Sequence, residues 1–284
     1  MGGNVMTLSG DVLDISEIVD FERHPIGPDG RFGSRVVERC RSELAKDGAC
    51  QLDGFMRPAA ARMVLDESEA LSGKAFRTDA AHNAYFTEVI AGAAEDDPRG
   101  VSLHSSKRAL GYKYCGASSP LRILYEWDGL VTFLKDALDL TDLYRDADPV
   151  GACSVMFYDE GDELGWHFDN SEFAVTLMLQ ECLEGGKFEY VPGIRTTDAE
   201  HFAAVQAVLD GAREPVRSLE AGPGTLTLFR GRYSLHRVTP VRGPTRRVNA
   251  VLAYASTPSH RLTPLNRRLF YGAEDDESSR DGSA

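Results

Sequence analysis

Residues 165–170, GWHFDN, place a histidine and a carboxylate two residues apart between apolar runs. The flanking sequences CSVMFY and EFAVTLMLQ are typical of buried strands. Side chains at i and i+2 of a strand point to the same face, so we expect His167 and Asp169 to lie side by side. Trp166 and Phe168 would then face the other way. Imidazole and carboxylate are common metal ligands, so this pair predicts part of a metal site.

A third ligand is available in a later β-rich run, SLHRVTPV, which carries His236. In a double-stranded β-helix, the strand bearing His236 can face the strand bearing His167 across the barrel. The set His167, Asp169 and His236 would then form a two-histidine, one-carboxylate face with open coordination positions, as in non-haem Fe(II) oxygenases. An HxD pair alone is a weak motif, and the second histidine on a strand strengthens it.

Two arginines follow in TRRVNAVLAY, on the next predicted strand. An oxygenase that uses 2-oxoglutarate must hold the distal carboxylate of a dianion, and a guanidinium group offers a planar pair of donors that matches it. Arg246 and Arg247 point to opposite faces of a strand, so one of them is suited to this role. We favour Arg247, which leaves Arg246 for solvent or a salt bridge.

The surrounding elements indicate an α+β fold with a mainly β core. Amphipathic helices are predicted from Ser34 to a stop at Gly48, within PAAARMVLDESEALSGKAF, within SSPLRILYEWDGLVTFLKDALDL and within AEHFAAVQAVLDGA. From about residue 150, short β-rich runs alternate with turn residues. This order predicts a double-stranded β-helix, or jelly roll, with supporting N-terminal helices. Residues 74–117 show little periodicity, and we expect an irregular segment that covers the substrate.

The expected domain organisation is simple. Residues 1–34 form an N-terminal extension, and 35–272 form one oxygenase domain. Its helical support spans 35–145, and its jelly-roll core spans 146–260. The acidic residues 273–284 have almost no apolar content, which predicts a disordered tail.

Composition excludes several classes of partner. The chain of 284 residues has a formal net charge of −13, which opposes binding to nucleic acid. No run is apolar enough for a membrane span, and no basic-then-apolar start indicates a signal peptide. Five cysteines without regular spacing are typical of a reducing compartment, so we expect a cytoplasmic protein. The oligomeric state stays open.

The sequence as a whole resembles the iron(II)/2-oxoglutarate-dependent oxygenases. Residues 35–260 are similar to the branch of free-amino-acid hydroxylases and halogenases, through SSKRALGY, SPLRILYEWDGL, LYRDADPVGA, LGWHFDNSEF and GGKFEYVPGIR. The resemblance implies that His167, Asp169 and His236 bind iron, and that Arg247 holds 2-oxoglutarate. It also implies Fe(II), 2-oxoglutarate and O₂ as cofactors. Halogenases of this branch carry Gly or Ala at the carboxylate position, so Asp169 predicts hydroxylation.

The resemblance also implies a small-molecule substrate, a free and possibly basic amino acid. Arg108 is a candidate partner of a substrate carboxylate, and Tyr158 of the cosubstrate. Asn170 and Asn249 are further polar candidates for substrate contacts. In each case a surface or core role is the alternative.

Three other functions compete with this one. Two histidines and a carboxylate also suit a zinc hydrolase, although HExxH is absent and Arg247 would have no role. A non-enzymatic β-sandwich binding module is the second alternative. The third is a hydroxylase of a peptide or of a carrier-bound residue.

Overall fold

A computed structural model describes residues 13–27, 29–87, 90–94 and 96–272 of the chain. The predicted tail at 273–284 lies outside these residues. Within the described part, no helix is both long enough and apolar enough to span a lipid bilayer.

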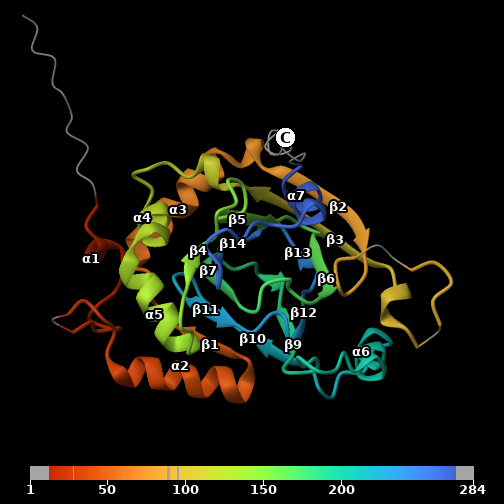
Figure 1. The fold of residues 1–284 in the computed structure, drawn as a ribbon. Helices are drawn as coiled ribbons and strands as arrows, with labels where there is room; N and C mark the ends of the chain where they lie inside the picture. Colours follow the sequence, from red (N-terminus) through yellow and green to blue (C-terminus); the bar gives the residue numbers. More distant parts are fainter. Residues whose placement is uncertain (1–12, 28, 88–89, 95, 273–284) are drawn as a thin grey trace, which may run out of the picture.

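A large antiparallel sheet curls into a roll at the centre of the molecule (Figure 1). Its strands follow the order β1-β11-β7-β14-β5-β3-β6-β12-β9-β10, and β2 pairs with β3. Two small sheets, β13-β8 and β15-β4, lie beside it. The strands are β1 (Ala49–Leu52), β2 (Phe76–His82), β3 (Leu103–Leu110), β4 (Tyr144–Arg145), β5 (Cys153–Tyr158), β6 (Glu163–His167), β7 (Ala174–Gln180), β8 (Glu184–Gly185), β9 (Phe188–Val191), β10 (Arg217–Leu219), β11 (Leu226–Phe229), β12 (Leu235–Val238), β13 (Val241–Arg242), β14 (Arg247–Leu252) and β15 (Tyr254–Ala255). The predicted jelly-roll fold is confirmed.

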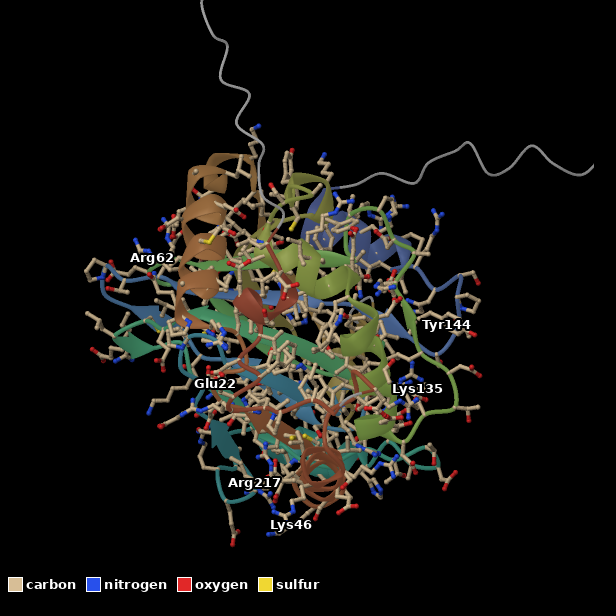
Figure 2. The ribbon with its side chains drawn as sticks, turned by 90° about the vertical axis from the view of Figure 1, so that its left-hand side faces the viewer. Glu22, Lys46, Arg62, Lys135, Tyr144 and Arg217 are labelled. Carbon is tan, nitrogen blue, oxygen red and sulfur yellow. The ribbon has the colours of Figure 1, made fainter. Side chains whose placement is uncertain are left out.

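Helices within residues 15–138 cover one side of this roll, on the left of Figure 1, and Figure 2 turns that side toward the viewer, whereas the two later helices lie elsewhere around the roll. The helices are α1 (Ile15–Ile18), α2 (Ser34–Asp47), α3 (Pro58–Ala70), α4 (Pro120–Glu126), α5 (Asp128–Leu138), α6 (Phe202–Leu209) and α7 (Pro264–Tyr271), with 3-10 turns η1 (Ser72–Lys74), η2 (Pro98–Gly100) and η3 (Tyr112–Tyr114). The predicted helix at 34–47 is confirmed, and it ends at Gly48, whose φ of 71° is left-handed.

The long helix predicted from SSPLRILYEWDGLVTFLKDALDL is wrong in one respect, because two helices replace it. Trp127 separates α4 from α5 with extended backbone, φ −71° and ψ 122°. Its ring packs edge-on against Phe21 and Phe32, at centroid distances of 5.7 and 6.0 Å. The helix is therefore interrupted at the residue whose ring packs against the core.

The irregular segment predicted at 74–117 is also corrected. It contains β2 and β3, which pair from Phe76 opposite Ala109 to His82 opposite Leu103. Both strands carry many polar side chains, and in β3 several of them are buried, including Ser105 and Lys107. Polar side chains that face inward hide the apolar alternation by which a strand is predicted. Helix α7 was not predicted either.

The main core lies between the roll and the helical side. It includes Phe55, Leu130 and Phe133, and also Ile18 and Val19 from the N-terminal segment. A second cluster lies toward α6 and contains Trp166 and Phe168 packed with Val205. The alternation predicted around the GWHFDN motif therefore holds for the strand: Trp166 joins a core outside the roll, and His167 faces inward.

Candidate active site

The pairing of β6 with β12 brings the two predicted histidine ligands together. His167 is the last residue of β6, and His236 lies directly opposite it on β12. The two strands are hydrogen-bonded neighbours, so the expectation that they face each other across the barrel is corrected. Asp169 lies beyond the end of β6, in the loop that follows. The alternation of β6 nevertheless continues past its end, because Phe168 joins Trp166 in the outer cluster and Asp169 lies on the same side as His167.

The three side chains converge at distances that suit one metal ion. Oδ1 of Asp169 lies 3.6 Å from Nε2 of His236 and 3.8 Å from Nε2 of His167. One ligand atom from each residue lies within 4.8 Å of the others. Ligand atoms bound to one iron or zinc ion at about 2.0–2.2 Å are expected about 3 Å apart or slightly more, so only a small contraction is needed.

Hydrogen bonds set the orientation of both imidazole rings. Nδ1 of His167 donates to the carbonyl of Gly165 at 2.8 Å, and Nδ1 of His236 donates to that of Ser234 at 2.9 Å. In each ring the proton on Nδ1 leaves Nε2 with its lone pair directed at the shared point. Burial, and next the neighbouring His236, hold the pKa of His167 well below its ordinary value, which favours the neutral ligand form.

Asp169 carries a buried oxygen that needs a partner. Its Oδ2 has no hydrogen bond among the described residues, although it is shielded from solvent. A buried unpaired carboxylate oxygen is costly, and a cation would offset that cost. The donor set and this orphaned oxygen both fit an iron ion held by His167, Asp169 and His236.

Gly231 provides the space in which Asp169 lies. The backbone N–H of Asp169 donates to the carbonyl of Gly231 at 3.1 Å. A Cβ atom built on Gly231 would overlap the Asp169 carboxylate. Sequence reasoning missed this glycine, because its role depends on a contact between segments far apart in the chain.

The triad lines a cavity of about 700 Å³ inside the roll. Arg247 also lines it, from β14, and is 7% exposed. Nη1 of Arg247 lies 3.3 Å from Sδ of Met178, and Nε has no partner among the described residues. Burial lowers the pKa of Arg247. A buried guanidinium without an acidic partner fits an anionic ligand, as the predicted cosubstrate requires.

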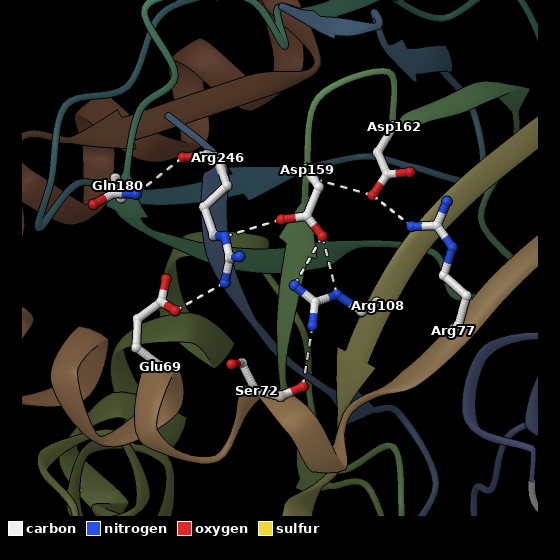
Figure 3. A network of polar contacts seen from close by, with 8 residues as sticks. All are labelled: Glu69, Ser72, Arg77, Arg108, Asp159, Asp162, Gln180 and Arg246. Atoms are coloured by element: carbon white, nitrogen blue, oxygen red, sulfur yellow. Dashed lines mark hydrogen bonds and ion pairs between the residues drawn. The ribbon is translucent and has the colours of Figure 1, made fainter. Parts of the chain in front are cut away.

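The neighbouring arginine points out of the roll (Figure 3). Arg246 pairs with Glu69 at 2.8 Å and with Asp159 at 3.0 Å. Arg108 belongs to the same network, at 2.8 Å from Asp159 and 3.2 Å from the carbonyl of Ser72. The structure therefore places Arg108 outside the cavity and does not support its predicted contact with substrate.

The other predicted residues line the cavity, as do some that the sequence did not reveal. Tyr158, Asn170 and Asn249 lie on its wall. The residues missed are Lys107, Phe86 and Phe270. Lys107 directly precedes Arg108 in β3. The sequence prediction therefore assigned the substrate-facing positive charge to the next residue, which lies on the opposite face of the strand.

Comparison with known proteins places this site in a family. A sequence model of the halogenase D family matches residues 118–265, which is just over half of the chain. The chain belongs to the halogenase D family. The predicted resemblance is thereby confirmed at the level of the family, together with the prediction of an enzyme. No curated protein matches the chain in sequence.

Solved structures confirm the fold. AviO1 from Streptomyces viridochromogenes Tue57 aligns with a TM-score of 0.53 at 16% identity, over 81% of this chain and 97% of its own. SnoN, a non-haem alpha-ketoglutarate-dependent epimerase from nogalamycin biosynthesis, aligns with a TM-score of 0.51 at 14% identity, over 79% and 84%. A 2OG-Fe(II) oxygenase family oxidoreductase from Burkholderia pseudomallei aligns with a TM-score of 0.50 at 16% identity, over 78% and 92%. Family, fold and triad together support Fe(II), 2-oxoglutarate and O₂ as cofactors.

The contact between Gly231 and Asp169 yields a prediction for metal binding. We expect Gly231→Ala to displace the Asp169 carboxylate and to weaken Mn²⁺ binding by about tenfold to a hundredfold, as for other residues that orient a ligand. Titration of the metal-free protein, followed by electron paramagnetic resonance, measures this. Gly73→Ala is the control, because nothing lies within 4 Å of a Cβ atom there. Equal affinity in the two variants would contradict the assigned role of Gly231.

Proposed function

We propose that the protein is an Fe(II)- and 2-oxoglutarate-dependent hydroxylase of a small polar substrate, a free amino acid. The observation that carries this proposal is the Asp169 carboxylate, 3.6 and 3.8 Å from the two imidazole nitrogens. In a family named for halogenation, a carboxylate at this point fills the coordination position that a halide would need. Hydroxylation is then the expected outcome.

The chain's own groups have distinct tasks in this reaction. Iron, 2-oxoglutarate and O₂ would supply the oxidising chemistry when bound, with succinate and CO₂ as coproducts. His167, Asp169 and His236 hold the metal through neutral imidazoles and one carboxylate. Arg247 binds the distal carboxylate of 2-oxoglutarate, next to Tyr158, whose ring centroid lies 6.0 Å from Cζ of Arg247. The buried wall excludes water and orients one C–H bond toward the metal.

Residues after β15 complete the wall. The cavity is lined by His260, and by Asn266, Phe270 and Tyr271 from α7. Tyr271 shares a hydrogen bond of 2.9 Å with the hydroxyl of Ser154 on β5, which fastens α7 to the roll. In the proposed function this segment covers the substrate together with Phe86 and Lys107 of the 74–117 segment.

One prediction of the proposed function concerns the carboxylate ligand. We expect Asp169→Gly to abolish hydroxylation, because the metal loses its only anionic protein ligand. Mass spectrometry, with a panel of free amino acids, measures the gain of one oxygen atom in the product. Asp198→Gly, in an exposed loop, is the control and should keep wild-type yield. Undiminished hydroxylation by Asp169→Gly would show that Asp169 is not a ligand.

A second prediction separates the two adjacent arginines. Arg247→Met should raise the Kd for 2-oxoglutarate by about 30-fold or more, because the buried partner of its distal carboxylate is removed. Arg246→Met removes only the outer contacts with Glu69 and Asp159 and should leave this Kd near wild type. Anaerobic calorimetric titration measures both. A larger effect from Arg246→Met would assign the clamp to the other arginine.

A further inference from the structure

The cavity holds a second buried cation besides Arg247. Lys107, on β3, is 6% exposed and lines the cavity wall. Its Nζ lies 4.3 Å from the centroid of the Phe270 ring. Within the described residues, no hydrogen bond or ion pair joins the ammonium group to an acidic side chain. The charge therefore faces the cavity without a counterion.

Such a charge is costly unless an anion compensates it. Burial lowers the pKa of Lys107 to about 8, and the one charge that opposes this shift is Asp169. Asp169 lies beyond ion-pair distance of Lys107 and is the proposed ligand of a cation. Once that carboxylate binds a metal, its negative charge is no longer available to Lys107, and the need for another anion increases.

Lys107 and Arg247 are placed to bind different anions. They lie on β3 and β14, which are separated by β5, so their backbones are roughly 10 Å apart at the usual strand spacing. The charged ends also have different neighbours: Nη1 of Arg247 lies 3.3 Å from Sδ of Met178 on β7, which is on the side of β14 away from β3, whereas Nζ of Lys107 lies against the Phe270 ring. One cation is thus assigned to 2-oxoglutarate, and the other is left for a second ligand.

The space beside Lys107 is bounded by aromatic rings next to the triad. The ring of Phe86 lies 4.8 Å from that of His167 and 5.3 Å from that of Phe270. Phe86 has a φ of 48°, a left-handed conformation that is unfavourable for a bulky residue and is often found at functional sites. A ligand held by Lys107 between these rings would therefore lie next to the metal ligands.

We propose that Lys107 binds the free α-carboxylate of the amino-acid substrate and so selects free amino acids over peptide-bound or carrier-bound residues. This inference rests on the proposed function. A carboxylate supplies the missing counterion, whereas an amide or thioester at the same position is neutral and leaves the lysine unpaired. The unpaired lysine charge in the cavity thus favours a ligand with an acid group, whatever its side chain.

The experiment is a cycle of two changes, one in the protein and one in the ligand. The probes are the standard L-amino acids and L-ornithine, each paired with its primary carboxamide. Each is titrated calorimetrically, without oxygen, into wild type and Lys107→Met loaded with Fe(II) and N-oxalylglycine. We expect at least one free acid to bind wild type about tenfold or more tightly than its amide. Lys107→Met should lose that preference, while its affinity for the amide changes little.

Two further variants complete the design. Lys46→Met removes an exposed lysine in the last turn of α2 (Figure 2) and should bind the probes as wild type does. Lys107→Arg, which keeps the charge, should restore part of the preference for the acid. Thermal unfolding by circular dichroism checks that each variant is folded.

Three results with the probe pairs would each overturn the inference. They are equal binding of acid and amide by wild type, an equal loss of both by Lys107→Met, and no binding by any free acid of the panel. Weaker binding of N-oxalylglycine by Lys107→Met would also overturn it, since the lysine would then serve the cosubstrate. Failure of the proposed function itself would give a different result. Wild type would then not bind Fe(II) with N-oxalylglycine and would not convert 2-oxoglutarate to succinate.

Discussion

The pairing of His167 with His236 across β6 and β12 is the constraint on which the site depends. Neighbouring antiparallel strands hold the two rings with their centroids 4.0 Å apart. Each Nδ1–H is used by a carbonyl two residues earlier in the chain, so both Nε2 atoms are available at one point. A slip of one residue in either strand would turn one imidazole to the opposite face. The metal site is thus a consequence of strand register.

The interior of the roll combines this site with uncompensated charge. Arg247 and Lys107 are both buried on the cavity wall, and neither forms an ion pair with an acid in the described part of the chain. The outer face of the same strands behaves differently, because Arg108 and Arg246 share Asp159 there (Figure 3). The two arginines outside the roll are therefore paired with acidic side chains of the protein, whereas the two cations inside it are free to bind anionic ligands. Alternation along β3 and β14 produces this division.

The sequence was sufficient for the fold class, the main helices and the residues of the triad, because each has a local signal. Apolar periodicity marks α2, and the HxD motif with a later histidine marks the ligands. The sequence was not sufficient to predict strands β2 and β3, because their inward side chains are polar and line a cavity. Nor could it choose between Lys107 and Arg108, since that choice depends on which face of β3 meets the roll. The contact between Gly231 and Asp169 joins distant segments and has no local signature.

Binding of one iron ion by His167, Asp169 and His236 underlies every role assigned above. Anaerobic crystals of the protein with Fe(II) and 2-oxoglutarate, measured at the iron absorption edge, would locate the metal. We expect one anomalous peak at the point shared by the two Nε2 atoms and the Asp169 carboxylate. Iron located elsewhere, or no peak between these three side chains at full metal loading, would contradict it.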